Sequence, residues 1–172
     1  MKPSGATPAH LALKHTPVAA EAVARVFQTI CDAAVRAHGT FAPDLVANGA
    51  IAGVIALMGD VEWSLWLGMP RATACAAAER FAGAPIPFDS DEMGDAIGEL
   101  TNMIAGDIKT RLSRQNLTVQ LSLPCVVSGE NLRILSRREM PSVTQRYTSP
   151  LGDLWTEVVA GVEVGRLRMA GS

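Results

Sequence analysis

Residues Asp91–Leu112, with the sequence DEMGDAIGELTNMIAGDIKTRL, form the stretch around which the rest of the chain is organised. Apolar residues recur here at the three- and four-residue spacing of an α-helix, which predicts a helix with one face buried in a core. The buried stripe consists of Met93, Ile97, Leu100, Ile104 and Ile108. The opposite stripe consists of Asp95, Glu99, Asn102, Gly106 and Lys109.

The polar stripe of this helix differs from an ordinary exposed face, because Gly98 and Gly106 flank and interrupt it. A glycine inside a helix costs about 1 kcal/mol relative to alanine. A helix that keeps glycines beside its polar stripe is expected to leave room for another backbone or side chain to approach. The sequence therefore predicts a bare surface that presents the Glu99 carboxylate and the Asn102 carboxamide one turn apart. We call this surface, formed by Asp95, Gly98, Glu99, Asn102 and Gly106, the ledge.

Both ends of the predicted helix carry the expected signals. Asp89 and Glu92 have the spacing of a capping box, and acidic residues in the first turn suit the positive end of the helix dipole. Lys109 and Arg111 lie near the other end, where cations suit the dipole. The same dipole would account for Asp95 without any functional role.

The spacing Asp95-x3-Glu99-x2-Asn102, followed by Gly106, resembles the signature of the CheC/CheX/FliY chemotaxis phosphatases. The single copy of the signature is most similar to CheX. The segment Leu121–Gly129, LSLPCVVSG, is similar to the strand and glycine that follow this helix in CheX-like domains. The chain departs from the family at the residue after Gly106, where relatives often have asparagine and this sequence has aspartate.

By this resemblance, the chain accelerates hydrolysis of the aspartyl-phosphate of a CheY-like receiver domain, in chemotaxis or in another two-component pathway. Asn102 would orient the attacking water, and Glu99 would anchor the helix to the active-site lysine of the receiver. Asp95, Gly98 and Gly106 would form the docking surface. The resemblance implies no cofactor of the chain's own, a Mg²⁺ ion held by the receiver, and a homodimer joined through the sheet.

The chemistry of an aspartyl-phosphate suits so sparse a site. An acyl phosphate is already activated, and phosphoryl transfer passes through a loose transition state in which positioning matters more than a strong base. A carboxamide can accept a hydrogen bond from water while it donates another. Two alternatives remain open: a catalytically silent CheX-like module that binds a receiver with the same ledge, and a structural domain of the flagellar-switch type. Glu99 alone would also fit an ordinary surface carboxylate.

Composition limits the other classes of function. The 172 residues are 48% hydrophobic and 19% charged, which is typical of one globular domain. We expect residues 1–16 to form a flexible tail and residues 17–172 to form the domain. A net charge of −2 gives no electrostatic case for nucleic acid or an anionic membrane. The longest apolar run, 47–58, is too short to span a bilayer, and no secretory signal is evident, so we expect a cytoplasmic protein.

The residues that most often bind metals or act as nucleophiles show no known pattern. Cys31, Cys75 and Cys125 are odd in number and widely spaced, which predicts reduced thiols in the core. The three histidines share no metal-ligand spacing, so we expect no metal site. The sequence contains no P-loop, nucleotide-binding glycine motif, nucleophile elbow or zinc-protease motif.

Periodicity and turn residues predict further elements along the chain. The helices are expected over 18–37, with a stop at Gly39, and from Pro70 to near Gly83. The strands are expected over 47–58, 61–67, 117–123, 132–135, 142–148, 154–160 and 162–167, with a hairpin turn at Gly59-Asp60.

A weak internal repeat relates the two halves of the chain. Residues 58–68 align with 151–161, and residues 21–30 align with 95–104. The repeat predicts an α+β fold, as in CheC/CheX-like proteins, in which two pseudo-repeated helix-plus-strands halves place two long helices on a mixed β-sheet.

The repeat also predicts how many ledges the molecule carries. In the alignment, Arg25 takes the place of Glu99 and Gln28 takes the place of Asn102. The first half therefore lacks the acid, and we expect one functional ledge.

Overall fold

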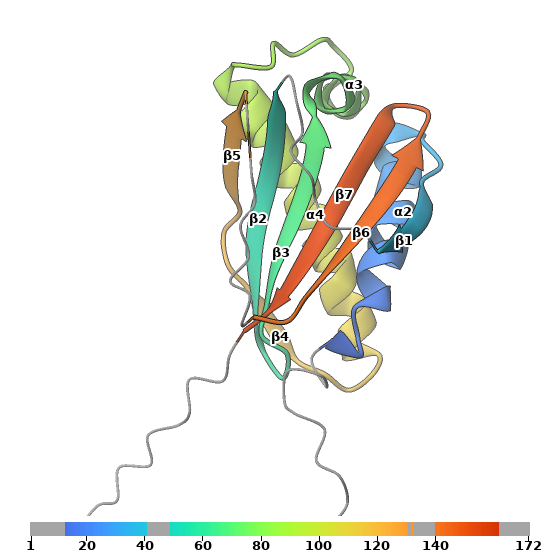
Figure 1. Cartoon of the computed structure of the whole chain (residues 1–172), viewed down its shortest axis with the longest axis vertical. Helices are drawn as coiled ribbons and strands as arrows, with labels where there is room; N and C mark the ends of the chain where they lie inside the picture. The colour runs from blue at the N-terminus through green and yellow to red at the C-terminus, as the bar shows by residue number, and fades with distance from the viewer. Residues whose placement is uncertain (1–12, 41–48, 131, 133–139, 162–172) are drawn as a thin grey trace, which may run out of the picture.

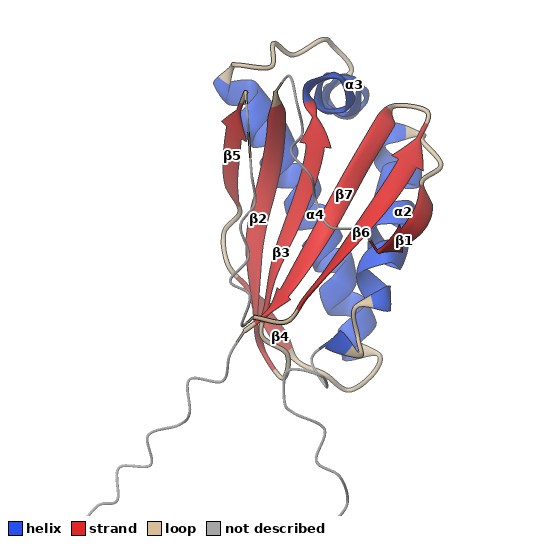
Figure 2. Cartoon of the chain, viewed as in Figure 1, coloured by secondary structure: helices blue, strands red, loops and turns tan. Residues whose placement is uncertain are grey.

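The predicted central helix is present as α4, which packs with a second long helix on one face of a β-sheet (Figures 1 and 2). The computed structural model describes residues 13–40, 49–130, 132 and 140–161. The described helices are α2 (Pro17–Cys31), α3 (Arg71–Ala82) and α4 (Asp91–Ser113). The described strands are β1 (Arg36–Thr40), β2 (Ala50–Gly59), β3 (Trp63–Pro70), β4 (Val119–Leu121), β5 (Cys125–Gly129), β6 (Ser142–Ser149) and β7 (Gly152–Ala160).

The apolar stripe of α4 lies in the core, as the periodicity predicts. All five of its residues, Met93, Ile97, Leu100, Ile104 and Ile108, are fully buried. The helix comes closest to the sheet at Gly53 of β2, where an added Cβ would lie 1.9 Å from the Thr101 hydroxyl oxygen. Since that contact leaves no space for a side chain at Gly53, it fixes α4 against β2. The opposite face of α4 is thereby turned away from the sheet.

The N-terminus of α4 is capped one residue later than predicted. Ser90 is the N-cap, and its hydroxyl accepts a hydrogen bond from the Met93 amide at 3.3 Å. Asp89, the predicted cap, instead binds the Arg71 guanidinium at 3.2 Å. Ser90 adopts the extended conformation of an N-cap residue, so the capping role falls to its hydroxyl.

The sheet has the order β1-β6-β7-β3-β2-β4, and β5 also pairs with β2. The sheet is arranged in the same way on both sides of the central β3–β7 pair. Next to β3 lies its hairpin partner β2, followed by β4 and β5 at the edge, and next to β7 lies its hairpin partner β6, followed by β1 at the other edge. The first half contributes the long helix α2 and the strands β1, β2 and β3. The second half contributes the long helix α4 and the strands β4 to β7, in which β4 and β5 together pair along β2 as one edge of the sheet. The predicted pseudo-repeat is therefore confirmed as an α+β architecture.

The strand directions differ from the expected mixed sheet, because every described pairing is antiparallel. Within each half, a tight hairpin joins the central strand to its neighbour, and hairpin strands are antiparallel. The pseudo-twofold relation between the halves makes the central β3–β7 pair antiparallel as well.

The largest error in the predicted elements concerns the end of the first helix. The helix ends at Cys31 rather than Ala37, and Asp32 has a left-handed φ of 48°. Residues Arg36–Thr40 instead form β1, which pairs with β6. The alanine spacing that suggested a longer helix is local, whereas the pairing with β6 joins residues more than a hundred positions apart. Tertiary pairing overrides the local pattern here.

The strand predicted over 117–123 is shorter, covering only Val119–Leu121. The separate β5 lies within the segment Leu121–Gly129, where the family resemblance indicated a strand and periodicity alone did not. The strands β2, β3, β6 and β7 and the helix α3 lie where the sequence predicts them, within a few residues. Three predictions lie mainly outside the described residues. They are the strand over 132–135, of which only residue 132 is described, the strand over 162–167, and the tail over 1–16, of which only residues 13–16 are described. No helix in the described part of the chain is long and apolar enough to cross a bilayer.

Candidate functional site

The ledge lies on the side of α4 that faces away from the sheet. Glu99 and Asp95 are exposed and Asn102 is half-buried, with Glu99 and Asn102 less than one turn apart. Within the described residues, the side chains of Asp95, Glu99 and Asn102 make no hydrogen bond or ion pair. The acid and the amide that the sequence singles out are therefore brought together on one surface, with their polar atoms unengaged by the described chain.

Of the two glycines of the ledge, Gly106 leaves the open space that its presence predicts and Gly98 does not. An added Cβ at Gly106 would meet no atom within 4 Å outside its own stretch of helix. At Gly98, which is buried, an added Cβ would lie 3.5 Å from Val126 and 3.8 Å from Pro124, which is ordinary van der Waals contact. The fold of the described chain therefore does not require either residue to be glycine.

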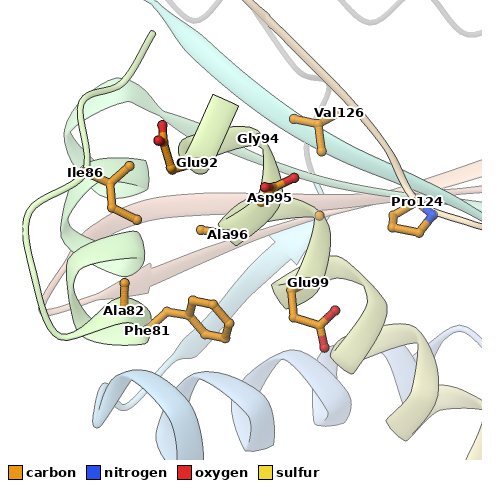
Figure 3. A pocket seen from close by; sticks show the side chains of 11 residues that line it. Phe81, Ala82, Ile86, Glu92, Gly94, Asp95, Ala96, Glu99, Pro124 and Val126 are labelled. Atoms are coloured by element: carbon orange, nitrogen blue, oxygen red, sulfur yellow. The ribbon is translucent and has the colours of Figure 1, made fainter. Parts of the chain in front are cut away.

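A groove with a volume of about 900 Å³ runs along the first half of the ledge (Figure 3). One wall comes from the end of α3 and the link that follows it, through Phe81, Ala82 and Ile86. The other wall comes from β5 and the residue before it, through Val126 and Pro124. The floor is the N-terminal part of α4, with Glu92, Gly94, Asp95, Ala96, Gly98 and Glu99. Asn102 is not part of the lining and follows Glu99 along the same stripe.

The groove combines apolar walls with an acidic floor. Glu92, Asp95 and Glu99 line it, and no basic side chain does. Hydrogen bonds from its own backbone amide and from Ser90 lower the pKa of Glu92, so that this carboxyl is charged at neutral pH. Such a surface favours a partner that brings a cation flanked by apolar side chains.

The corresponding face of α2 carries different chemistry. Arg25, which aligns with Glu99, donates a hydrogen bond to Asp107 on α4 at 2.7 Å. Gln28, which aligns with Asn102, donates to Asp32 at 3.4 Å. In the first half, the aligned side chains are engaged within the chain, and the position of the acid holds a cation.

Asp107 has a role that the sequence did not reveal. Its carboxylate binds Arg25 on α2 and also Arg111 on α4, the latter at 2.5 Å, and Arg111 in turn binds Glu21 on α2. We call these four residues the helix clasp. The clasp lies between the two long helices and off the ledge, so the departure from the family pattern after Gly106 leaves the ledge unchanged.

The sequence did not identify the walls of the groove. Phe81 and Ile86 lie in segments that carry no motif, and Pro124 fell beside a strand that was expected to be half-buried. Pro124 was the available signal, since a proline cannot donate to a strand ladder and therefore ends or interrupts a strand.

The cysteines are free, but their environments differ from the prediction. Cys31 is buried, Cys75 is half-buried and Cys125 is exposed, so the predicted core location is wrong for Cys125. Cys125 pairs with Val54 of β2, and both side chains lie on the face of the sheet opposite the helices. Across the described ranges, no group of three or more histidine, cysteine, aspartate or glutamate side chains is placed to hold a metal ion.

Comparison with known proteins gives a consistent result. Residues 51–148 match the family model described as chemotaxis phosphatase CheX. A protein of Thermotoga maritima described as CheY-P phosphatase CheX is 31% identical over 119 residues, which cover 66% of this chain and 77% of that protein.

Solved structures share the fold. Chemotaxis protein CheX from Vibrio vulnificus superposes with a TM-score of 0.77 at 21% identity, covering 86% of this chain and 99% of that one. The CheX of Borrelia burgdorferi, solved in a CheX–CheY–BeF3–Mg complex, superposes with a TM-score of 0.63 at 22% identity, covering 85% of this chain and 96% of that one.

Proposed function

The chain belongs to the CheX family of chemotaxis phosphatases, and from this premise we propose that it hydrolyses the aspartyl-phosphate of a CheY-like receiver domain. The related protein of Thermotoga maritima carries the name of a CheY-P phosphatase, and the Borrelia burgdorferi relative was solved together with CheY. The observation that carries the proposal for this chain is the ledge itself. An exposed acid and a half-buried amide stand side by side on a helix face, with no partner among the described residues.

In the proposed mechanism, Asn102 orients the attacking water. Its carboxamide can accept a hydrogen bond from the water and donate another to the phosphoryl group. Partial burial limits the rotamers of the side chain, which favours a fixed direction of attack. Because phosphoryl transfer from an acyl phosphate depends on positioning more than on a strong base, one amide is sufficient.

Glu99 has a different role in this mechanism, which is to anchor the helix over the phosphoaspartate through the active-site lysine of the receiver. The acidic floor of the groove supports this assignment, since it favours a cation at the end where Glu99 lies. Asp95 adds a second carboxylate to the docking surface, and Gly106 leaves room for the receiver, whereas Gly98 is buried beside Pro124 and Val126. The proposal needs no cofactor in this chain and places the Mg²⁺ ion in the receiver.

The proposal is tested with a receiver labelled with ³²P on its aspartate, by following the loss of label in the presence of the protein. Asn102→Ala is expected to slow the accelerated hydrolysis by about 100-fold, the order of effect of removing one positioned transition-state group. Glu99→Ala is expected to weaken the acceleration mainly at low protein concentration, because it removes an anchor. Gln28→Ala, at the aligned position on α2, is the matched control and should leave hydrolysis unchanged.

The same experiment separates the phosphatase from a silent receiver-binding module. A wild-type protein that binds a beryllofluoride-activated receiver without accelerating loss of label would be such a module. Equal hydrolysis by Asn102→Ala and wild type would rule out the mechanism proposed for the amide.

We also propose that the protein forms a homodimer through its sheet. The support is the sheet face opposite α2 and α4, which Figure 1 shows toward the viewer. Trp66 of β3 is half-buried and belongs to the register on that face, because its neighbours Leu65 and Leu67 are core residues on the side of the helices. Light scattering at micromolar concentration should give twice the chain mass, and a monomer mass would contradict the proposal.

A further inference from the structure

The strand that borders the ledge contains one extra residue. Along β2, Leu57 pairs with Leu121, whereas Val54 pairs with Cys125. Three steps along β2 thus correspond to four steps along its partner, which defines a β-bulge at Leu123 and Pro124. Pro124 has no amide hydrogen to continue the ladder, so the interruption falls where the sequence cannot pair.

The bulge is held in place by hydrogen bonds on its β4 side. The Ser122 amide donates to the Ala56 carbonyl at 3.0 Å, and the Ala56 amide donates to the Ser122 hydroxyl at 3.0 Å. The same hydroxyl donates to the Leu123 carbonyl at 2.9 Å. A side-chain oxygen therefore replaces the backbone acceptor that the bulge removes, and the position of Leu123 is fixed by the sheet.

The consequence of the bulge is that Leu123 points out of the fold. The alternation of β4 would place it on the face of Val119, which is buried, yet Leu123 is 89% exposed. The other large hydrophobic residue exposed in the described chain is Met58, at 48%. A bulge next to a functional site is a common device for redirecting one side chain.

Leu123 lies beside the ledge. The chain leaves the end of α4 with the Leu117 amide bound to the Leu112 carbonyl, and it then runs back along the helix. By Pro124 it has reached Gly98, where an added Cβ would lie 3.8 Å from the proline ring. Leu123 directly precedes the proline that contacts Gly98 of the ledge. Pro124 and Val126 form the apolar wall of the groove that Figure 3 shows, and Leu123 adjoins this wall in sequence, outside the lining of the groove.

We infer that Leu123 is an apolar anchor for the phosphorylated receiver, set beside the ledge by the bulge at Leu123 and Pro124. This inference rests on the proposed function and adds to it the chemistry of the partner's docking surface: an apolar side chain adjacent to the cation that meets the acidic floor. The receiver is favoured as the occupant because the apolar wall is continuous with the acidic surface that it is proposed to cover. Leu123 touches the partner surface and not the reacting atoms, so it sets affinity and not the chemical rate.

The test compares Leu123→Ser with Met58→Ser, since both remove an exposed apolar side chain and only the first adjoins the groove wall at Pro124. Binding is measured by titration with a beryllofluoride-activated receiver, and hydrolysis is measured by loss of ³²P. Burial of a leucine side chain predicts that Leu123→Ser weakens binding and raises KM by about 10- to 100-fold, with kcat unchanged. Met58→Ser should match wild type in both measurements, and Leu123→Met should restore most of the affinity. Thermal unfolding of all three variants should match wild type, because the side chains are exposed.

Two results would overturn the inference. The first is equal receiver binding by Leu123→Ser and Met58→Ser. The second is a changed oligomer mass for Leu123→Ser with receiver binding intact, which would assign Leu123 to a contact between copies of the chain. The titration decides the role of Leu123 independently of the catalytic mechanism. If Asn102→Ala hydrolyses the phosphate as fast as wild type, the mechanism proposed for the amide fails, and a loss of binding in Leu123→Ser would still establish the anchor.

Discussion

Asp107 illustrates how a single residue can be constrained by the fold while it neighbours the ledge. Its side chain is 9% exposed and joins Arg25 of one long helix to Arg111 of the other. Neutralising this nearly buried carboxylate removes the partner of Arg25 and leaves Arg111 with Glu21 alone.

We therefore expect Asp107→Asn to lower the free energy of unfolding by roughly 2 kcal/mol, the order found for hydrogen bonds to charged groups. The measurement is urea unfolding followed by circular dichroism. Asp153→Asn is the control, because its ion pair with Arg146 is about half exposed on both sides and should contribute less than about 1 kcal/mol. Equal losses in the two variants would show that the helix clasp contributes no more than a surface ion pair.

Cys31 offers a second test at the residue scale. Burial raises the pKa of its thiol from 9.0 to about 11, against a smaller opposing effect of Arg80. Below pH 9 the thiol is protonated in both the folded and the unfolded chain. Between about pH 9 and pH 11 only the unfolded chain loses the proton, so the free energy of unfolding falls by about 1.4 kcal/mol per pH unit.

The expected result is a steeper loss of stability above pH 9 for wild type than for Cys31→Ala, measured by denaturant unfolding at a series of pH values. Cys125→Ala, at an exposed position, is the control and should retain the wild-type slope. Parallel curves for wild type and Cys31→Ala would contradict the assigned environment of the thiol.

Single residues also show where sequence reasoning reaches its limit. Glu99 and Asn102 could be found because helix periodicity alone fixes which side chains share a face. Leu123 could not, since its outward direction depends on a one-residue shift in pairing with β2, and such a shift reverses every later side chain. The exposure of Cys125 has the same origin.

Among the secondary-structure elements, α4 carries a stability cost at Gly106 that the proposed docking surface would explain. Gly106 lies in a helix interior with open space around the position of a side chain. We expect Gly106→Ala to raise the free energy of unfolding by up to about 1 kcal/mol, because alanine is the better helix former. The same substitution should weaken receiver binding, since the added methyl group stands on the docking surface.

Unfolding and receiver titration of the same variant check this prediction, and opposite signs are the expected outcome. Gly53→Ala is a useful contrast, because its Cβ would collide with Thr101 and should destabilise the fold. A Gly106→Ala variant that gains stability and binds the receiver like wild type would show that the open space has no role in docking.

The elements that were predicted correctly are determined by neighbouring residues, whereas those that were missed are determined by residues far away in the sequence. The boundaries of α4 follow from local signals, namely apolar periodicity and acidic residues in the first turn, although the cap is Ser90 rather than the predicted Asp89. The strand β1 was missed because Arg36–Thr40 has little strand character of its own and pairs with β6 from the other half of the chain. Local sequence predicts a helix well and an edge strand poorly, because an edge strand is defined by its partner.

At the scale of the whole molecule, the two halves share one architecture and differ in the side chains that their long helices present. Each half supplies a long helix and its strands to a sheet with matching order on both sides of the β3–β7 pair. The first helix uses the aligned face for the helix clasp, and the second leaves it open as the ledge. The repeat could be detected from the sequence, and so could the loss of the acid in the first half. The groove could not, because its walls come from α3 and β5, which are distant in sequence from each other.

The central claim is that Asn102, on an open helix face, directs water at a phosphoaspartate in another protein. The most direct test is single-turnover hydrolysis of a ³²P-labelled receiver at saturating protein, which removes binding from the comparison. The account predicts that Asn102→Ala binds the receiver as wild type does and lowers the saturated rate by about 100-fold, while Gln28→Ala retains the full rate. A saturated rate for Asn102→Ala equal to that of wild type would contradict the account.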